Sequence, residues 1–325
     1  MNKKTLFIVS ILMLLIVACN HEKKINETKL QGLVFGTSYH ITYLNTTNYQ
    51  KSIDSLFQVV NKSLSTYIPT SDISKINKGD STVVIDDLFL EVFQKSKRIY
   101  KETDGYFDPT VCNLVNAWGF GYKKQKKDLD TLQVNELMKQ VGLDKITIGD
   151  RRVKKKFPNA CLDFNSIAKG YGIDVIGRFF EDKKITNYLV EIGGEIRARG
   201  KNSRNVYWKV AIDDPNVDGT RSVSQFIELN NQSMAGSGNY RKFRISKNGN
   251  KIVHTINPKT GFATESNLLS ATVYGNFDCA DADAYATSFM AMGISKSKEF
   301  LSKYSEVKAI LLYVDEKGRI AEFKQ

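Results

Sequence analysis

The stretch YLVEIGGEIRAR, Tyr188–Arg199, decides the fold of this chain, because two short strand-like runs flank a pair of glycines. Runs that alternate apolar and polar residues are typical of half-buried strands. The pair Gly193–Gly194 suits the tight turn of a hairpin. The sequence therefore predicts two neighbouring antiparallel strands, Tyr188–Ile192 and Glu195–Arg199.

The chain on the C-terminal side of this hairpin continues in the same way. Further strands are expected at Val206–Ile212, Ser222–Leu229, Lys251–Ile256 and Leu268–Tyr274. A helix is expected at Asp281–Met292. After it, Val307–Val314 and Arg319–Phe323 are expected to form a closing hairpin. Most of these strands follow one another without a helical crossover, and this order favours antiparallel pairing.

The N-terminal side supplies most of the helices. Val34–Leu44 alternates like a strand, whereas Ile53–Leu64 and Leu88–Tyr100 carry apolar residues at helical spacing. Another helix is expected from Lys169 to about Glu181. Hairpins with separate helices predict an α+β fold of mainly antiparallel sheets with packed helices. No glycine fingerprint follows a strand within a βαβ unit, and this absence argues against a Rossmann domain.

The first residues predict export. Lys3 and Lys4 precede the apolar stretch Leu6–Val17, which is too short for a comfortable membrane span. Ile16-Val17-Ala18-Cys19 resembles a lipobox, so we expect residues 1–18 to be a lipoprotein signal peptide, Cys19 to be lipidated and residues 19–30 to be a polar tether. The chain would then be a membrane-anchored lipoprotein facing the periplasm or the cell exterior. The alternative is an ordinary secretory signal with an incidental cysteine.

Charge and cysteine content argue against a nucleic-acid-binding protein, a disulfide-framework protein and a zinc protein. The net charge of +12 comes from lysines in runs such as 123–127 and 154–156, which are typical of a solvated face. No nucleic-acid partner is expected. After Cys19 the cysteines are Cys112, Cys161 and Cys279, an odd number without metal-ligand spacing. We expect neither a disulfide framework nor a zinc site, and Cys112 is expected to pack among apolar residues.

Short motifs along the chain carry the candidate chemistry. They are TDGYFDPTV from Thr103 with WGFG from Trp118, DFNSIAKG from Asp163, EIGGE from Glu191, HTINPKTG from His254 and ADAYAT from Ala282. In this order they resemble the FAD:protein FMN transferases, the ApbE family, from about Gly36 to about Gly293. The resemblance implies an ApbE-like fold, an FMN transferase domain over residues 31–325, FAD as substrate and Mg²⁺ as cofactor.

A metal site is expected on the helix near residue 283. Asp283 and Thr287 lie four residues apart, so both side chains share one helix face. A carboxylate and a hydroxyl are hard oxygen ligands that suit Mg²⁺. Taken alone, such a pair is more often a cap or a surface pair. The resemblance implies that both bind the metal together with the backbone carbonyl of Ser166. Asp281 is a nearby carboxylate that would support this shell without being a ligand.

The resemblance also implies a set of contacts to FAD. These residues are Phe35, Tyr67, Tyr106, Phe107, Asp108, Asp163, Lys169 and Ile256. Tyr67 would stack on the dinucleotide, and Lys169 would pair with the pyrophosphate beside the helix N-terminal amides near Ser166.

Several of these motifs also have a purely structural interpretation. Asp163 would be a plain N-cap. Phe107 would be a packed aromatic, with Asp108 capping the turn before Pro109. The family commonly has methionine where this chain has Phe35. The segment 237–241 is either a phosphate-binding loop with Arg241 or a hairpin turn, and Trp118 is expected in the core.

His254 is the candidate general base or phosphate-orienting residue. It is one of only three histidines, and an imidazole titrates near working pH. It precedes a Pro-Lys-Thr-Gly turn that would fix the local backbone. The alternative is a structural histidine, which is the commoner case for a lone residue of this type.

The resemblance implies Mg²⁺-dependent transfer of FMN from FAD to a Thr or Ser hydroxyl of an exported flavoprotein, with release of AMP. A FAD pyrophosphatase would use the same site with water as the acceptor and yield FMN and AMP. A flavin-binding lipoprotein without turnover is the alternative from another class, and it would not need the pair Asp283 and Thr287. The sequence leaves open the identity of the acceptor, the choice between Mg²⁺ and Mn²⁺, and the oligomeric state.

Overall fold

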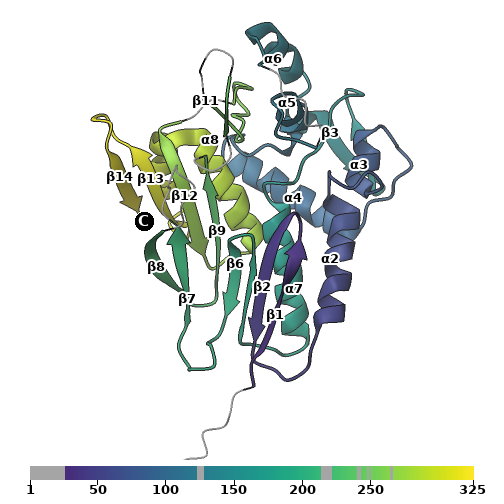
Figure 1. Cartoon of the computed structure of the whole chain (residues 1–325). Helices are drawn as coiled ribbons and strands as arrows, with labels where there is room; N and C mark the ends of the chain where they lie inside the picture. The colour runs from purple at the N-terminus through teal and green to yellow at the C-terminus, as the bar shows by residue number, and fades with distance from the viewer. Residues whose placement is uncertain are drawn as a thin grey trace, which may run out of the picture.

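An eight-stranded antiparallel sheet organises the chain (Figure 1). The computed structural model describes residues 26–122, 128–213, 222–239, 243–246, 249, 251–263 and 266–325. The strand order is β1-β2-β5-β6-β9-β12-β13-β14. Their bounds are β1 Thr28–Val34, β2 Thr37–Tyr43, β5 Tyr188–Ile192, β6 Glu195–Arg199, β9 Gln232–Gly238, β12 Leu268–Gly275, β13 Lys308–Val314 and β14 Ile320–Lys324.

Smaller sheets and the helices complete the fold. The two-stranded sheets are β3 (Ile146–Gly149) with β4 (Arg152–Lys155), β7 (Trp208–Asp213) with β8 (Val223–Leu229), and β10 (Phe243–Ile245) with β11 (Lys251–Val253). The helices are α2 Gln50–Leu64, α3 Asp72–Asn77, α4 Asp87–Glu102, α5 Cys112–Ala117, α6 Thr131–Met138, α7 Ala168–Asp182 and α8 Cys279–Lys303, with 3-10 turns at Pro109–Val111 and Leu143–Lys145. The predicted α+β fold is confirmed.

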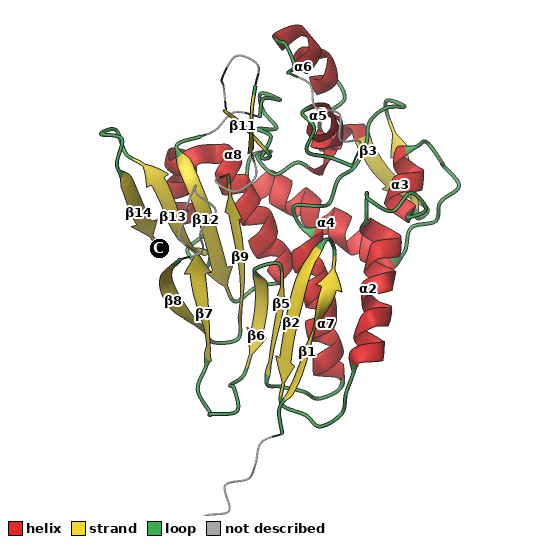
Figure 2. Cartoon of the chain, viewed as in Figure 1, coloured by secondary structure: helices red, strands yellow, loops and turns green. Residues whose placement is uncertain are grey.

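Helices α7 and α8 pack directly on the eight-stranded sheet. Helix α8 packs on β9 and β12, α7 packs on β5 and β6, and α2 and α4 pack on these helices (Figure 2). A Cβ atom on Gly170 would lie 2.3 Å from the carbonyl oxygen of Cys279, so glycine is what permits the close crossing of α7 and α8. This crossing brings the DFNSIAKG and ADAYAT motifs together.

The hairpin predicted from Gly193–Gly194 is present between β5 and β6. Both glycines have positive φ, 64° and 104°, as a two-residue hairpin turn with the native strand twist requires. Gly193 N also donates to Ser38 O at 3.0 Å, which ties the turn to β2. The closing hairpin of β13 and β14 is likewise as predicted.

The sequence prediction misplaced some strand ends and did not predict β3, β4, β10, α3, α5 or α6. The expected strand Val34–Leu44 is the second half of a hairpin, because Phe35 (φ 52°) and Gly36 (φ 78°) turn the chain between β1 and β2. Strand β1 begins at Thr28 and so lies partly in the segment assigned to the tether, since Thr28–Leu30 pair with β2. Strand β9 was missed, because its small residues and glycines are typical of a loop. Strand β11 ends at Val253 rather than at Ile256.

The expectation of no disulfide is wrong for one pair. Cys112 and Cys161 form a disulfide with a Cα–Cα distance of 5.7 Å, whereas Cys279 is free and buried. The spacing of three cysteines carries no information on pairing, and only the tertiary structure brings α5 beside the segment before Asp163. Among the described residues no helix is long and apolar enough to cross a membrane.

The disulfide leads to a stability prediction. The cysteines are 49 residues apart, and we expect the Cys112→Ser/Cys161→Ser protein to lose about 2–5 kcal/mol of unfolding free energy, as is typical when a native disulfide is removed. Urea denaturation without reductant measures this change. Wild type in excess reductant serves as the control, and unchanged midpoints in both samples would show that the bond does not stabilise the fold.

Candidate active site

One large cavity collects the predicted site residues. Its volume is about 1290 Å³, above the roughly 300–1,000 Å³ typical of small-molecule pockets. It lies between the β5–β6 hairpin, β9 and β12 on one side and α2, α5 and the starts of α7 and α8 on the other. Its lining includes Phe35, Tyr67, Tyr106, Phe107, Asp108, Asp163, Ser166, Lys169, His254, Ile256, Asp283 and Thr287.

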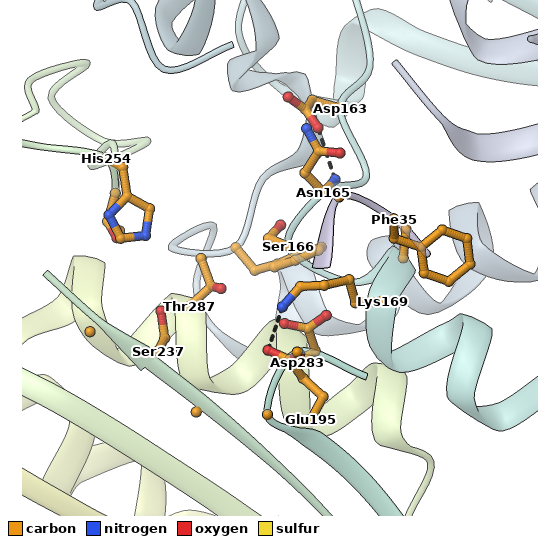
Figure 3. Close-up of a pocket in the computed structure, with 18 of the residues that line it drawn as sticks. Phe35, Asp163, Asn165, Ser166, Lys169, Glu195, Ser237, His254, Asp283 and Thr287 are labelled. Carbon is orange, nitrogen blue, oxygen red and sulfur yellow. Dashed lines mark hydrogen bonds and ion pairs between the residues drawn. The ribbon is translucent and has the colours of Figure 1, made fainter. Parts of the chain in front are cut away.

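The predicted metal pair lies on α8 and faces the cavity (Figure 3). Asp283 is only 5% exposed, and its Oδ2 accepts a hydrogen bond from Gly170 N at 3.2 Å. Burial raises the pKa of the Asp283 carboxyl, while the charge of Lys169 opposes this shift. A buried carboxylate is stabilised by a cation. Together with the Thr287 hydroxyl and the Ser166 carbonyl, it offers the hard oxygen set that suits Mg²⁺.

This donor set contains a single carboxylate. In the described ranges no group of three or more His, Cys, Asp and Glu side chains is placed to hold a metal ion. The predicted site is of a different kind, since its other protein donors are a hydroxyl and a backbone carbonyl. Mg²⁺ typically keeps several waters and takes one or two carboxylates together with substrate phosphates, so a site with one carboxylate fits it.

Asp281 does not support the metal pair directly. Two residues correspond to about 200° around a helix, so Asp281 points away from Asp283. Its carboxylate pairs with Lys95 at 3.2 Å and Arg98 at 2.7 Å on α4, and it is absent from the cavity lining. Asp281 therefore fastens α8 to α4.

Glu195 is the site residue that the sequence analysis missed. Its Oε1 pairs with Lys169 Nζ at 2.5 Å, as drawn in Figure 3, and the side chain lines the cavity. Its Oε2 is buried and has no hydrogen-bond partner. Burial raises the pKa of Glu195 to about 7. Burial alone would lower the pKa of Lys169, but the carboxylates of Glu195 and Asp283 raise it. The only sequence signal was the last letter of EIGGE.

Asp163 caps a turn and also faces the cavity. Its Oδ1 accepts from Asn165 N at 2.8 Å, so it does cap the turn before α7. It also lines the cavity. Tyr67 is 56% exposed at the same cavity, and burial together with the charge of Asp163 raises the pKa of the Tyr67 phenol. Tyr67 therefore offers an accessible ring close to Asp163.

The TDGYFD segment forms a wall of the cavity. Phe107 is 2% exposed and belongs to the main hydrophobic core, as the packing interpretation predicted. Asp108 Oδ1 accepts from Thr110 N at 2.8 Å, and burial raises the pKa of this carboxyl to about 6. Tyr106 has Lys259 Nζ 5.7 Å and Lys296 Nζ 5.8 Å from its ring centre. Of these three residues, Phe107 and Asp108 are buried, whereas Tyr106 is only partly buried.

Phe35 reaches the cavity from the turn between β1 and β2. Its ring centre lies 5.6 Å from that of Phe57 in an edge-to-face arrangement. A Cβ atom on Gly172 would lie 2.6 Å from the Phe35 ring, so the glycine in α7 leaves the space that this aromatic occupies. The phenylalanine keeps an apolar surface at this position of the cavity.

His254 follows β11 and lies on the opposite side of the cavity from Phe35 (Figure 3). It is half-buried, and its ring centre lies 6.4 Å from that of Phe120. Trp118 Nε1 donates to Gly261 O at 2.9 Å, so the WGFG and HTINPKTG motifs contact one another. Trp118 is 5% exposed and packs in the core as predicted. Ser237 lines the cavity from β9, whereas Arg241 lies outside the described residues.

A family model and the relatives of known sequence all match this chain to the same family. The model of the ApbE family matches residues 35–311. A protein of Haemophilus influenzae named FAD:protein FMN transferase is 35% identical and covers 97% of this chain and 94% of its own length. A protein of Vibrio cholerae with the same name is also 35% identical, over 86% of this chain and 85% of its own.

A solved structure agrees with this similarity. The structure titled Flavin Transferase ApbE from Vibrio cholerae superposes with a TM-score of 0.81 at 31% identity, covering 92% of this chain and 97% of that one. The ApbE-like fold predicted from the motifs is therefore confirmed.

Proposed function

Because this chain belongs to the ApbE family and is a FAD:protein FMN transferase, we propose that it joins FMN from FAD to a Thr or Ser hydroxyl of an exported flavoprotein, uses Mg²⁺ and releases AMP. The observation that carries this proposal is that the predicted metal pair, Lys169 and His254 line the same cavity. A carrier that only binds flavin would need neither a buried carboxylate on α8 nor a histidine across the cavity from it.

The pyrophosphate of FAD would be held beside α7 and α8. Asp283, Thr287 and the Ser166 carbonyl would hold Mg²⁺, which when bound neutralises charge on the pyrophosphate oxygens. Lys169 adds a cation in the same region, and Glu195 keeps its ammonium group in place at 2.5 Å. The amides at the start of α7 also favour an anion. The exposed ring of Tyr67 and the half-buried ring of Tyr106 are suited to stacking on the flavin or adenine.

The transfer itself requires removal of a proton from the acceptor. His254 would take the proton of the acceptor hydroxyl as general base. The hydroxyl oxygen then forms a bond to the phosphorus of the FMN half, and the bond from that phosphorus to the bridging oxygen of the pyrophosphate breaks. AMP leaves with that oxygen, and the proton remains on the imidazole. Water in place of the hydroxyl would give the hydrolase reaction.

One experiment separates the candidate functions. The soluble domain is incubated with FAD, Mg²⁺ and an acceptor flavoprotein, and the acceptor is weighed by mass spectrometry. We expect a mass increase equal to an attached FMN group, together with released AMP. FMN and AMP without modified acceptor would support the pyrophosphatase, and unchanged FAD would support the carrier.

FAD affinity should depend on Tyr67 and Lys169. Loss of ring stacking or of the half-buried ammonium group is expected to weaken FAD binding about tenfold, the equivalent of roughly 1.4 kcal/mol. Calorimetric titration of Tyr67→Ala and Lys169→Met measures this change. Tyr207→Ala is the matched control, since this ring contacts Lys201 and not the cavity. Unchanged affinity in both site variants would contradict their assignment as FAD contacts.

We also propose that the chain is a lipoprotein anchored through Cys19, whose surroundings lie outside the described residues. The Cys112–Cys161 disulfide supports export, because disulfides persist mainly in oxidising compartments. Cys19→Ala is expected to move the protein from the membrane fraction to the soluble fraction or to leave the precursor uncleaved. Metabolic labelling with a fatty acid is the direct measurement. A wild-type protein without label would rule out the anchor.

A further inference from the structure

The start of α8 is capped by a residue of another helix. The N-cap residue of α8, Asp278, makes no capping hydrogen bond with its side chain. That carboxylate instead pairs with Lys95 at 2.8 Å, Arg178 at 2.9 Å and Arg197 at 2.8 Å. The first two helical amides donate to Asp174 of α7, Cys279 N to Oδ1 at 2.9 Å and Ala280 N to Oδ2 at 2.8 Å.

Asp174 is also held by a residue of β6. It is fully buried, and its Oδ1 also accepts from Arg197 Nη1 of β6 at 2.7 Å. Both carboxylate oxygens are therefore occupied by donors from two separate elements. An asparagine would offer one acceptor oxygen and would turn an NH₂ group toward a donor, so no neutral side chain of this size satisfies all three donors.

Helix α7 makes a second contact with α8, one helical turn before Asp174. Gly170 N donates to Asp283 Oδ2 at 3.2 Å, at the crossing where Gly170 meets the Cys279 carbonyl. Gly170 and Asp174 are four residues apart, so they lie on the same face of α7. Together they hold the first turn of α8 from Cys279 to Asp283. Asp174 itself is absent from the cavity lining.

We infer that Asp174 is a positioning residue: by capping α8 from α7 it sets where Asp283 and Thr287 stand as ligands of Mg²⁺. This inference rests on the proposed function. Mg²⁺ demands near-ideal octahedral geometry, so a small shift of the α8 first turn is costly for binding. Residues that do not bind the metal but hold its ligands in position typically change metal affinity or activity about 10–100-fold when they are replaced.

The test compares two helix caps, the fully buried Asp174 and the partly buried Asp86. Asp174→Ala removes the cap of α8, and Asp86→Ala removes the cap of α4, where Asp86 accepts from Phe89 N at 2.9 Å. Asp86 does not line the cavity. Mn²⁺ binding to the FAD-free proteins is measured by electron paramagnetic resonance, the apparent KM for Mg²⁺ by transfer assay, and Tm by calorimetry.

We expect both variants to have a lower Tm, but only Asp174→Ala to bind Mn²⁺ about 10–100-fold more weakly and to need correspondingly more Mg²⁺. FAD affinity without metal should stay at the wild-type value. Asp174→Asn, which keeps the side-chain size, carries the same test if the alanine variant does not fold, with a smaller expected loss.

The outcomes separate this inference from the proposed function. Wild-type Mn²⁺ affinity in a folded Asp174 variant would overturn the positioning role and leave the metal site standing. A wild-type protein that binds neither Mn²⁺ nor Mg²⁺ would overturn the proposed metal site, and the inference with it. Equal losses of metal affinity in the Asp174 and Asp86 variants would show a general effect of destabilisation and would also overturn it.

Discussion

Asp283→Ala is expected to lower the rate of FMN transfer about 10³-fold or more while leaving FAD binding largely intact. The carboxylate is buried at the cavity on α8 and is the only acidic side chain of the predicted donor set. A metal ion supplies several kcal/mol of charge stabilisation in such a transition state, and each 1.36 kcal/mol corresponds to tenfold in rate. Transfer is followed by the mass of the acceptor, and FAD binding by calorimetry.

The same helix provides the matched control for this prediction. Asp281→Ala also removes a carboxylate from the first turns of α8, but Asp281 faces Lys95 and Arg98 and not the cavity. This variant should lose stability and keep most of its rate per folded molecule. EDTA should abolish the wild-type activity, and added Mg²⁺ should restore it. Full activity of Asp283→Ala would remove this residue from the site.

His254→Ala is expected to lower the rate of transfer about 10²–10⁴-fold, the usual effect of losing a general base, while FAD still binds. The ring lines the cavity and is half-buried beside Phe120. A purely structural role predicts a lower Tm with little change in rate per folded molecule. Measuring both quantities on one preparation distinguishes the two roles.

His40→Ala is the control for the histidine prediction. His40 lies in β2, pairs with Glu191 at 2.7 Å and does not line the cavity, so its loss should leave the rate unchanged. His21 lies outside the described residues. A near-wild-type rate in His254→Ala would leave Asp163 as the better candidate for the base.

Local patterns in the sequence predicted most elements of the fold. The turn at Gly193–Gly194 needs positive φ at both positions, a requirement that glycine meets without strain and that is visible in the letters alone. Helices α2 and α4 follow from the spacing of their apolar residues, and a helix was also expected at the position of α7. Strand β9 could not be predicted in this way, because small residues form a strand there only between β6 and β12, which supply its hydrogen bonds.

For the candidate site, too, the sequence predicted the relations between nearby residues, and tertiary structure decided those between distant ones. Asp283 and Thr287 share a helix face because they are one turn apart, so the sequence alone placed them together, and the motifs alone identified the family. Tertiary structure decided everything that joins distant segments: the Cys112–Cys161 disulfide, the Lys169–Glu195 pair and the Asp174 cap of α8. Local preferences act over a few residues, whereas these contacts link positions up to 106 apart. Packing of α7, α8 and β6 brings the Lys169–Glu195 pair and the Asp174 cap within bonding distance, and packing of α5 beside the segment before Asp163 does the same for the two cysteines.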